Sequence, residues 1–248
     1  MLPPVVAIIQ ARMNSTRLPG KVLLPIEGES MLERVVRRVQ RAKSIDKVVV
    51  ATTEDPADDA VAEAAEALGV HVTRGSEDDV LDRFRQAAEE TGAAHIVRVS
   101  ADSPFIDPDV CDMVVDAYRS SGADYASNKL EPSFPLGLDV EVFSREALEK
   151  TWSEAKEPYE RAHVTLHMYA PTTGKLSLVL QPVTTSPDRH DWRWTVDTPE
   201  DLEFAREAFR RIGGRNDFSW VDVVHLIDED PALAGINSHL KPKHVTEG

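Results

Sequence analysis

A chain of 248 residues is long enough for one large α/β domain. Its formal net charge of -15 argues against general binding to nucleic acids or anionic membranes, which demand extended basic surface. The single cysteine excludes an internal disulfide and is typical of a reducing cytoplasm. We therefore expect a cytoplasmic protein that binds neither nucleic acid nor membrane, and we interpret the apolar N-terminus as a first strand rather than a signal peptide.

Strand-like and helix-like segments alternate through the first half of the chain. Buried-strand runs are expected at 5–10, 47–53, 70–75, 95–102 and 123–128. Amphipathic or capped helices are expected at 29–43, 56–69, 77–92 and 108–122. Strands separated by helices of this length predict parallel βαβ crossovers, and hence a Rossmann-like three-layer αβα fold with a mostly parallel sheet.

The rhythm changes after residue 128, although nothing demands a second independent domain. We interpret 1–248 as one domain in which 128–190 is an insertion that forms an acceptor lid or a dimer contact. The later expected elements are a helix at 157–169, a strand at 175–183, a strand leading into a capped helix at 191–213, and a helix at 217–233.

The loop after the first strand locally reverses the charge of the chain. The first 26 residues contain no acid, and their only charges are Arg12, Arg17 and Lys21. Backbone amides, hydroxyls and three cations between a strand and a helix suit a polyphosphate. Surface loops also carry basic residues without a ligand, so this loop alone leaves both interpretations open. It matches neither the Walker A pattern nor the dinucleotide fingerprint.

Two aspartates follow predicted strands at the edge where ligands bind in such sheets. Asp102 comes after the strand at 95–101, and Asp197 ends the strand expected at 192–196. Carboxylate oxygens there can coordinate Mg²⁺, which binds polyphosphates. Each aspartate could instead begin a turn or cap a helix. Their combination with the cationic loop favours the metal interpretation.

Residues 10–25, QARMNSTRLPGKVLLP, closely resemble the opening loop of the nucleotide-sugar cytidylyltransferases, which are CMP-sugar-acid synthetases. The similarity is greatest to the branch that includes the spore-coat polysaccharide biosynthesis protein F. It continues, in the same order, through GSEDDVLDRF, VRVSADSPFIDP, PLGLDVEVF, EPYERAHVT and WRWTVDTPEDL. The resemblance thus covers roughly residues 5–210 of the chain.

This resemblance implies a homodimeric enzyme that transfers CMP from CTP to a sugar acid with Mg²⁺ as cofactor and releases pyrophosphate, in cell-surface or spore-coat polysaccharide biosynthesis. The catalytic residues would be Arg12, Lys21, Asp102 and Asp197, the two aspartates being the metal ligands. The expected nucleotide-binding residues are Gln10, Ala11, Arg12, Met13, Ser15, Arg17, Lys21, Ser76 and Asp79. The expected acceptor-binding residues are Gly137, Asp139, Glu141, Glu160 and His163.

Several alternatives stay open at this point. Asp139 and Glu141, at strand spacing, can face a sugar, a second metal or only water. Within the cytidylyltransferases, their segment resembles poorly both the enzymes that act on 3-deoxy-manno-octulosonate and those that act on sialic acids. The acceptor is therefore undefined. His163 and His167 have a zinc-like spacing, but no Glu follows His163 and no cysteine pair accompanies them. Two other functions are alternatives. A glycosyltransferase that uses a nucleotide sugar would bind only a diphosphate, for which three loop cations are more than required. A non-catalytic nucleotide-binding protein would be expected to lose one of Lys21, Asp102 and Asp197, and this chain has all three.

Overall fold

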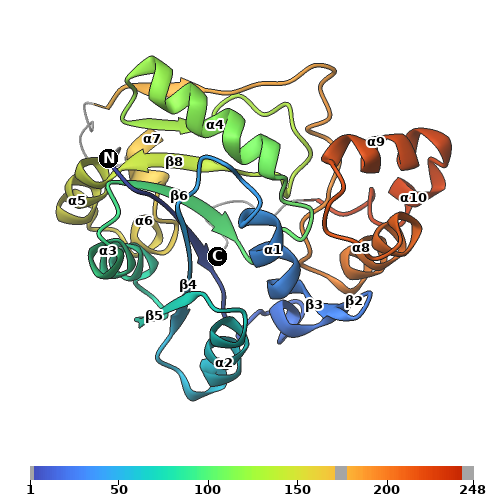
Figure 1. Cartoon of the computed structure of the whole chain (residues 1–248), viewed down its shortest axis with the longest axis horizontal. Coiled ribbons are helices and arrows are strands. Elements are labelled where there is room, and N and C mark those ends of the chain that lie inside the picture. Colours follow the sequence, from blue (N-terminus) through green and yellow to red (C-terminus); the bar gives the residue numbers. More distant parts are fainter. Residues whose placement is uncertain (1–2, 171–177, 242–248) are drawn as a thin grey trace.

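The computed structural model describes residues 3–170 and 178–241, and a seven-stranded sheet lies at its centre (Figure 1). The strand order is β5-β4-β1-β6-β8-β7-β9. Their bounds are β1 (Val5–Gln10), β4 (Lys47–Thr53), β5 (His71–Gly75), β6 (His95–Ser100), β7 (Tyr125–Ser127), β8 (Glu141–Ser144) and β9 (Leu180–Pro182). Within this sheet β8 is antiparallel to its neighbours and the other pairings are parallel, which confirms the predicted mostly parallel sheet.

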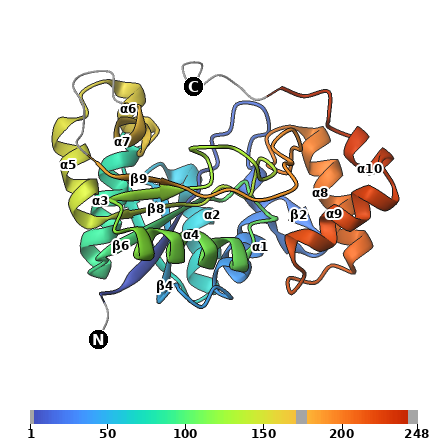
Figure 2. The ribbon, with the colours of Figure 1, turned by 90° about the horizontal axis from the view of Figure 1, so that it is seen from above.

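Helices cover both faces of the sheet because its strands are apolar on both sides. Along β1, Val5, Ala7 and Ile9 belong to one core, whereas Val6 and Ile8 belong to the other. The first face packs against α1 (Met31–Val39), α2 (Asp59–Ala67) and α4 (Pro108–Ser121). The second packs against α3 (Val80–Thr91) and α5 (Arg145–Glu154), which gives the three predicted layers (Figure 2).

The C-terminal helices form one end of the molecule, on the right of Figure 1. They are α8 (Pro199–Ile212), α9 (Trp220–Glu229) and α10 (Ala232–Gly235), beside a small hairpin of β2 (Pro25–Ile26) and β3 (Glu29–Ser30). Two buried arginines of α1, Arg34 and Arg38, join this end to the sheet by donating to backbone carbonyls. The acceptors are Ile26, Glu27 and Gly214 for Arg34, and Phe105, Ile106, Asn216 and Phe218 for Arg38.

The capping residues explain where several helices begin. The hydroxyl of Ser30 accepts a hydrogen bond from the Glu33 amide at the start of α1, as expected. Thr198 forms a capping box with Asp201 at the start of α8, so Thr198 rather than Asp197 caps that helix. This leaves the Asp197 side chain available to the loop after β1.

Two expected elements are wrong. The helix expected at 157–169 is broken into α6 (Pro158–Ala162) and α7 (Leu166–Tyr169), because Val164 between them has a φ of 59°. His163 and His167 therefore do not share one helical face. The strand expected at 192–196 is reduced to an isolated bridge between Leu136 and Arg193, so Asp197 follows irregular backbone.

Residues 128–190 contribute to the central layer of the fold. They supply β8 between β6 and β7 and β9 at one edge of the sheet, together with the helices α5 to α7. The strand expected at 175–183 is observed as β9, and residues 175–177 lie outside the described residues. The role of this segment as an acceptor lid or dimer contact stays a prediction.

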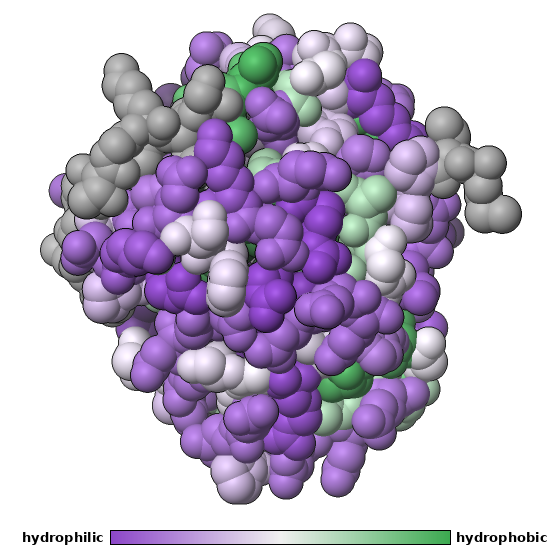
Figure 3. All heavy atoms as spheres, turned by 90° about the vertical axis from the view of Figure 1, so that its left-hand side faces the viewer, coloured by the Kyte–Doolittle hydropathy of each residue, from purple (hydrophilic) through white to green (hydrophobic). Residues whose placement is uncertain are grey.

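Polar side chains dominate the face of the molecule on the left of Figure 1, where apolar residues are scattered (Figure 3). Across the described ranges, we find no helix with both the length and the apolar character that crossing a membrane requires.

Candidate active site

The cationic loop is folded around Met13 and attached to the carboxyl end of β4. The Met13 amide donates to the buried carboxylate of Asp58 at 2.6 Å, and the Met13 carbonyl accepts from the amides of Ser15 and Gly20. Asp58 also accepts from the amide and hydroxyl of Thr53 at the end of β4. Gly20 has a φ of 71°, and this left-handed conformation leads the chain into a short 3₁₀ helix, Lys21–Leu23.

Lys21 joins the loop to both predicted metal ligands. Its Nζ lies 2.8 Å from Asp102 Oδ2, 2.8 Å from Asp197 Oδ1 and 2.8 Å from the Val196 carbonyl oxygen. Burial of the ammonium acts to lower the pKa of Lys21, but the two carboxylates raise it above its ordinary value. Lys21 therefore stays charged and holds the segments after β6 and before α8 together.

Asp197 accepts from three cations. Besides Lys21, it pairs with Arg17 at 2.9 Å and with Arg193 at 2.8 Å, both through Oδ2. Burial acts to raise the pKa of Asp197, but these cations hold it below its ordinary value. The carboxylate is thus ionised and balances the charge of the loop.

A buried network supports this aspartate from behind. Arg193 donates to both carboxylate oxygens of Asp201, at 2.9 and 3.0 Å, and Asp201 also accepts from the Asp197 amide at 3.0 Å. The Asn237 amide group donates to Asp201 Oδ1 and to the Arg193 carbonyl, both at 2.9 Å. These three residues were not anticipated. The T-P-E-D capping sequence could have indicated Asp201, but nothing local indicated Asn237.

The donor set at this edge fits a divalent cation that arrives with a polyphosphate. Asp102 and Asp197 both lie 2.8 Å from one Nζ, so their carboxylates already converge. The second oxygen of Asp102 has no hydrogen-bond partner among the described residues. Those residues contain no cluster of three or more His, Cys, Asp or Glu donors. One or two carboxylates completed by phosphate oxygens is the usual Mg²⁺ environment in nucleotide sites.

A second buried network starts at the end of β1 and runs to β8. Gln10 accepts from Arg98 on β6, and Arg98 pairs with Glu141, the first residue of β8. Glu141 also accepts from the hydroxyls of Tyr125 at 2.7 Å and Thr165 at 2.6 Å. Burial acts to raise the pKa of Glu141, but Arg98 and its other partners lower it to about 2. Glu141 is therefore an ionised structural carboxylate, and its predicted contact with the acceptor stays a prediction.

Asp139, two residues earlier, has the opposite surroundings. It is half-buried, and no described residue donates a hydrogen bond to its carboxylate. Burial raises the pKa of Asp139; Lys129 opposes this shift, whereas the charges of Glu141 and Asp102 reinforce it. Asp139 thus combines a raised proton affinity with a position in the electrostatic field of the Asp102 site.

Gly137 brings the segment before Asp139 into backbone contact with the segment before Asp197. Its φ is 109°, and a Cβ there would lie 2.5 Å from the Thr195 amide nitrogen. Next to it, the Leu136 amide donates a hydrogen bond of 2.9 Å to the carbonyl of Trp192, which lies on the segment before Asp197. The structure therefore gives Gly137 a packing role, and its predicted contact with the acceptor is untested.

The other predicted contacts lie around this centre rather than in it. Arg12 reaches Glu77 at 3.3 Å, Asp79 caps α3 and pairs with Arg161 at 2.6 Å, and the exposed Ser76 accepts from the Asp79 amide. Two of the remaining predicted residues, Ala11 and Glu160, are buried, and Glu160 forms a hydrogen bond with His167. The others, Met13, Ser15 and His163, are half-buried.

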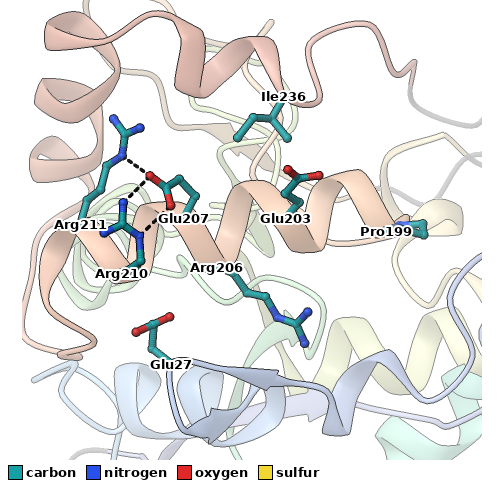
Figure 4. A pocket seen from close by; sticks show the side chains of 8 residues that line it. All are labelled: Glu27, Pro199, Glu203, Arg206, Glu207, Arg210, Arg211 and Ile236. Carbon is teal, nitrogen blue, oxygen red and sulfur yellow. Dashed lines mark hydrogen bonds and ion pairs between the residues drawn. The ribbon is translucent and has the colours of Figure 1, made fainter.

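A cleft of about 630 Å³ lies elsewhere, along α8 and facing the hairpin (Figure 4). Part of its charged lining is paired internally, since Glu207 binds both Arg210 and Arg211. Glu203 and Arg206 complete the charged side of the cleft. No nucleophile, metal-ligand cluster or unpaired buried charge is present among these lining residues, so we place the reaction at Lys21 instead.

The fold and the site together are those of a nucleotidyltransferase, and comparisons with known proteins identify the family. The model of the cytidylyltransferase family matches residues 6–216. Spore coat polysaccharide biosynthesis protein SpsF of Bacillus subtilis is 34% identical, with 92% of this chain and 95% of that protein aligned. The 3-deoxy-manno-octulosonate cytidylyltransferase of Pelobacter propionicus is 34% identical, over 84% of this chain and 98% of that protein.

A solved structure agrees with these relatives. A cytidylyltransferase from Leptospira borgpetersenii superposes with a TM-score of 0.88 at 33% identity, covering 98% of this chain and 100% of that one. The chain belongs to the cytidylyltransferase family and is a CTP-dependent nucleotidyltransferase. Family membership therefore favours this interpretation over a glycosyltransferase or a non-catalytic nucleotide-binding protein.

Proposed function

We propose that this protein transfers CMP from CTP to a sugar acid, with release of pyrophosphate, in the synthesis of a cell-surface or spore-coat polysaccharide. The observation that carries the proposal is the convergence of Lys21, Asp102 and Asp197 beside a cationic loop, in a chain of the cytidylyltransferase family. The sugar acid and the polysaccharide pathway follow the names of the two relatives.

The loop residues bind the triphosphate. Arg17 and Lys21 are already fixed beside Asp197, and Arg12 extends from the same loop. Phosphate oxygens replace part of the carboxylate contacts of these cations when CTP binds. Donors held in place before the reaction stabilise the negative charge that grows on the departing pyrophosphate.

Asp102 and Asp197 are the residues that would hold Mg²⁺ with the nucleotide. When bound, the ion supplies additional neutralisation of the triphosphate charge. Asp102 would offer its unpaired oxygen to the ion, and Asp197 would give up one of its cationic partners to bind it. The Asp201–Arg193 pair keeps Asp197 in position during this exchange.

The acceptor hydroxyl attacks the α-phosphorus of CTP. The new bond joins this oxygen to phosphorus, the bond from phosphorus to the bridging oxygen of pyrophosphate breaks, and the hydroxyl proton passes to Asp139. Asp139 suits this role because its carboxylate has no hydrogen-bond donor among the described residues and burial raises its pKa. Lys129, exposed nearby with a pKa raised by Glu141, presents a positive charge to the carboxylate of the sugar acid.

A pyrophosphate-release assay tests the proposal. The wild-type protein is supplied with Mg²⁺, each of the four nucleoside triphosphates, and a panel of 2-keto sugar acids. Release that requires both CTP and one of the acids supports the proposal. Binding of CTP without turnover on any acid contradicts the acceptor class, and failure to bind any triphosphate contradicts the assignment of the loop.

A further inference from the structure

The segment before Asp197 has no strand ladder to fix its direction. The amides of residues 194–196 donate to the carbonyls of Leu136 and Asp102, and the segment has no other β-type pairing than one isolated bridge in the described part of the chain. Ladder hydrogen bonds at every second residue would otherwise hold such a segment in register. The position of the Asp197 carboxylate therefore depends on side chains that bind this segment from behind.

One buried ion pair holds both the backbone and the side chain of Asp197. Asp201 is fully buried and accepts a hydrogen bond from the Asp197 amide at 3.0 Å. Arg193 donates to Asp197 Oδ2 at 2.8 Å and to both carboxylate oxygens of Asp201. Any shift of this ion pair therefore moves the carboxylate that we assign to Mg²⁺.

Asn237 reaches this ion pair from the C-terminal part of the chain. It lies two residues after α10 and beyond residue 216, where the match to the cytidylyltransferase family ends, and it is 1% exposed. Its Nδ2 donates to Asp201 Oδ1 and to the Arg193 carbonyl, both at 2.9 Å. A single NH₂ group thus binds the side chain of one partner and the backbone of the other. Only an amide suits this position, because a carboxylate has no hydrogen to donate.

The segment that carries Asn237 is anchored by contacts away from the ion pair. Leu233 on α10 is 1% exposed and belongs to the core. Asp230, just before this segment, pairs with Arg211 of α8 at 2.9 Å, and the Leu240 amide donates to the Asn237 carbonyl at 3.0 Å. The amide of Asn237 is therefore a fixed point against which the ion pair is held.

We propose that Asn237 is a positioning residue for metal binding, an inference that rests on the proposed function. By holding Asp201 and the Arg193 backbone, it keeps the Asp197 carboxylate turned toward Asp102, with which Asp197 shares the Lys21 ammonium. Residues that orient a metal ligand from behind contribute about 10- to 100-fold to metal affinity or activity. The C-terminal segment thus acts on the reaction through Asp197.

The test compares Asn237→Leu with wild type in the absence of any acceptor. Leucine has nearly the size of asparagine but donates no hydrogen bond. Mn²⁺ replaces Mg²⁺, so that electron paramagnetic resonance measures the free ion while excess protein keeps all of the CTP bound. We expect the affinity of the protein–CTP complex for Mn²⁺ to fall about 10-fold. The affinity for CTP alone, measured by calorimetry in EDTA, should change little, because Asn237 does not touch the loop cations.

Val223→Ala is the matched control in the same C-terminal helices. Val223 on α9 is fully buried and takes no part in the hydrogen bonds around Asp201, so its truncation lowers Tm and leaves the Mn²⁺ affinity unchanged. The inference is overturned if Asn237→Leu lowers Tm without weakening Mn²⁺, since Asn237 is then only structural. It is also overturned if Val223→Ala weakens Mn²⁺ as much as Asn237→Leu, since general loosening then explains both.

Failure of the proposed function has a different signature. A wild type that releases no pyrophosphate with any acid contradicts the proposed function, whereas the binding comparison needs no acceptor and still decides the role of Asn237. A loss of Mn²⁺ affinity confined to Asn237→Leu supports the inference in that case, and equal Mn²⁺ affinities of variant and wild type overturn it.

Discussion

Buried arginines occur on both faces of the sheet, and their surroundings differ. On α1, Arg34 and Arg38 donate to backbone carbonyls from three separate parts of the chain, 26–27, 105–106 and 214–218, and Arg38 also stacks on Phe218 at 3.8 Å. On α3, Arg83 is equally buried, yet its Nε and Nη1 have no acceptor among the described residues. A buried charge whose donors all meet fixed carbonyls is part of the scaffold. A buried charge whose donors meet no acceptor among the described residues does not hold separate segments together in this way.

Lys21 stands between these two cases. Its Nζ is fully paired, as in the scaffold, but two of its three partners are carboxylates that face the proposed nucleotide site. The pairing therefore prepares the site in the free protein, and a ligand rearranges it rather than completing it. The predictions below test whether the scaffold cation Arg38 and the site cation Lys21 differ as the structure implies.

The largest effect is expected for the scaffold cation, with Arg38→Met. This change leaves several buried carbonyls without a donor and Asp107 without its nearest cation, 3.7 Å away. We expect the free energy of unfolding to fall by about 3–5 kcal/mol in denaturant titrations. The adjacent Arg37→Met is the control, because that exposed residue pairs only at the surface and should cost less than about 1 kcal/mol. Equal losses in both variants would remove the distinction between scaffold and surface arginines.

The next effect concerns Lys21→Met. Removal of the ammonium leaves Asp102 and Asp197 to repel each other and takes a preorganised donor from the triphosphate. We expect kcat for pyrophosphate release to fall about 10²- to 10³-fold, with the fold retained by circular dichroism. A kcat within a few-fold of wild type would place Lys21 with the scaffold cations.

How far the sequence predicts this molecule depends on how local each feature is. The alternation of apolar segments and the capping residues are local, and they predicted the layers and most helices. Lys21 and Asp102 follow the carboxyl ends of β1 and β6, where ligand-binding loops leave such a sheet, whereas no strand precedes Asp197, which the family resemblance indicated. These residues were therefore predictable as a set before their distances were known.

The features that were missed depend on contacts between distant segments. The helix at 157–169 breaks at Val164 where Thr165 turns to bond Glu141, 24 residues earlier in the chain. Residues 192–196 form backbone hydrogen bonds with Leu136 and Asp102 instead of joining the sheet as a strand. The unpaired state of Arg83 arises because the nearby acids Asp58, Glu77 and Asp79 bind other groups, so no sequence pattern indicates it.

A smaller, pH-dependent effect is expected for Glu141→Gln. The pKa of Glu141 falls from 4.5 to about 2 on folding, so its carboxylate stabilises the protein above pH 4.5, and this contribution is lost as the pH falls toward 2. Wild type should therefore exceed the variant in unfolding free energy at neutral pH, by a margin that shrinks at about pH 3. Denaturant titrations at both pH values measure the margin. A margin independent of pH would show that packing, not charge, is what Glu141 contributes.

The smallest effect is expected for Asn237→Ala, which removes one support of the Asp201–Arg193 pair. The lost hydrogen bonds should cost about 1–2 kcal/mol of stability. Because Asp197 loses rigidity rather than charge, kcat should fall by less than in Lys21→Met, with KM for CTP nearly unchanged. A kcat loss as large as that of Lys21→Met would mean that the C-terminal segment takes a direct part in the reaction.

The most direct test of the central claim is pyrophosphate release by Asp102→Asn with CTP, Mg²⁺ and a sugar acid that the wild type accepts. Glu203→Gln in the charged cleft of Figure 4 serves as the control. The site at Lys21 predicts a kcat loss of about 10²-fold or more for Asp102→Asn and wild-type turnover for Glu203→Gln. Wild-type turnover by Asp102→Asn, or a comparable loss in Glu203→Gln, would contradict this location of the reaction.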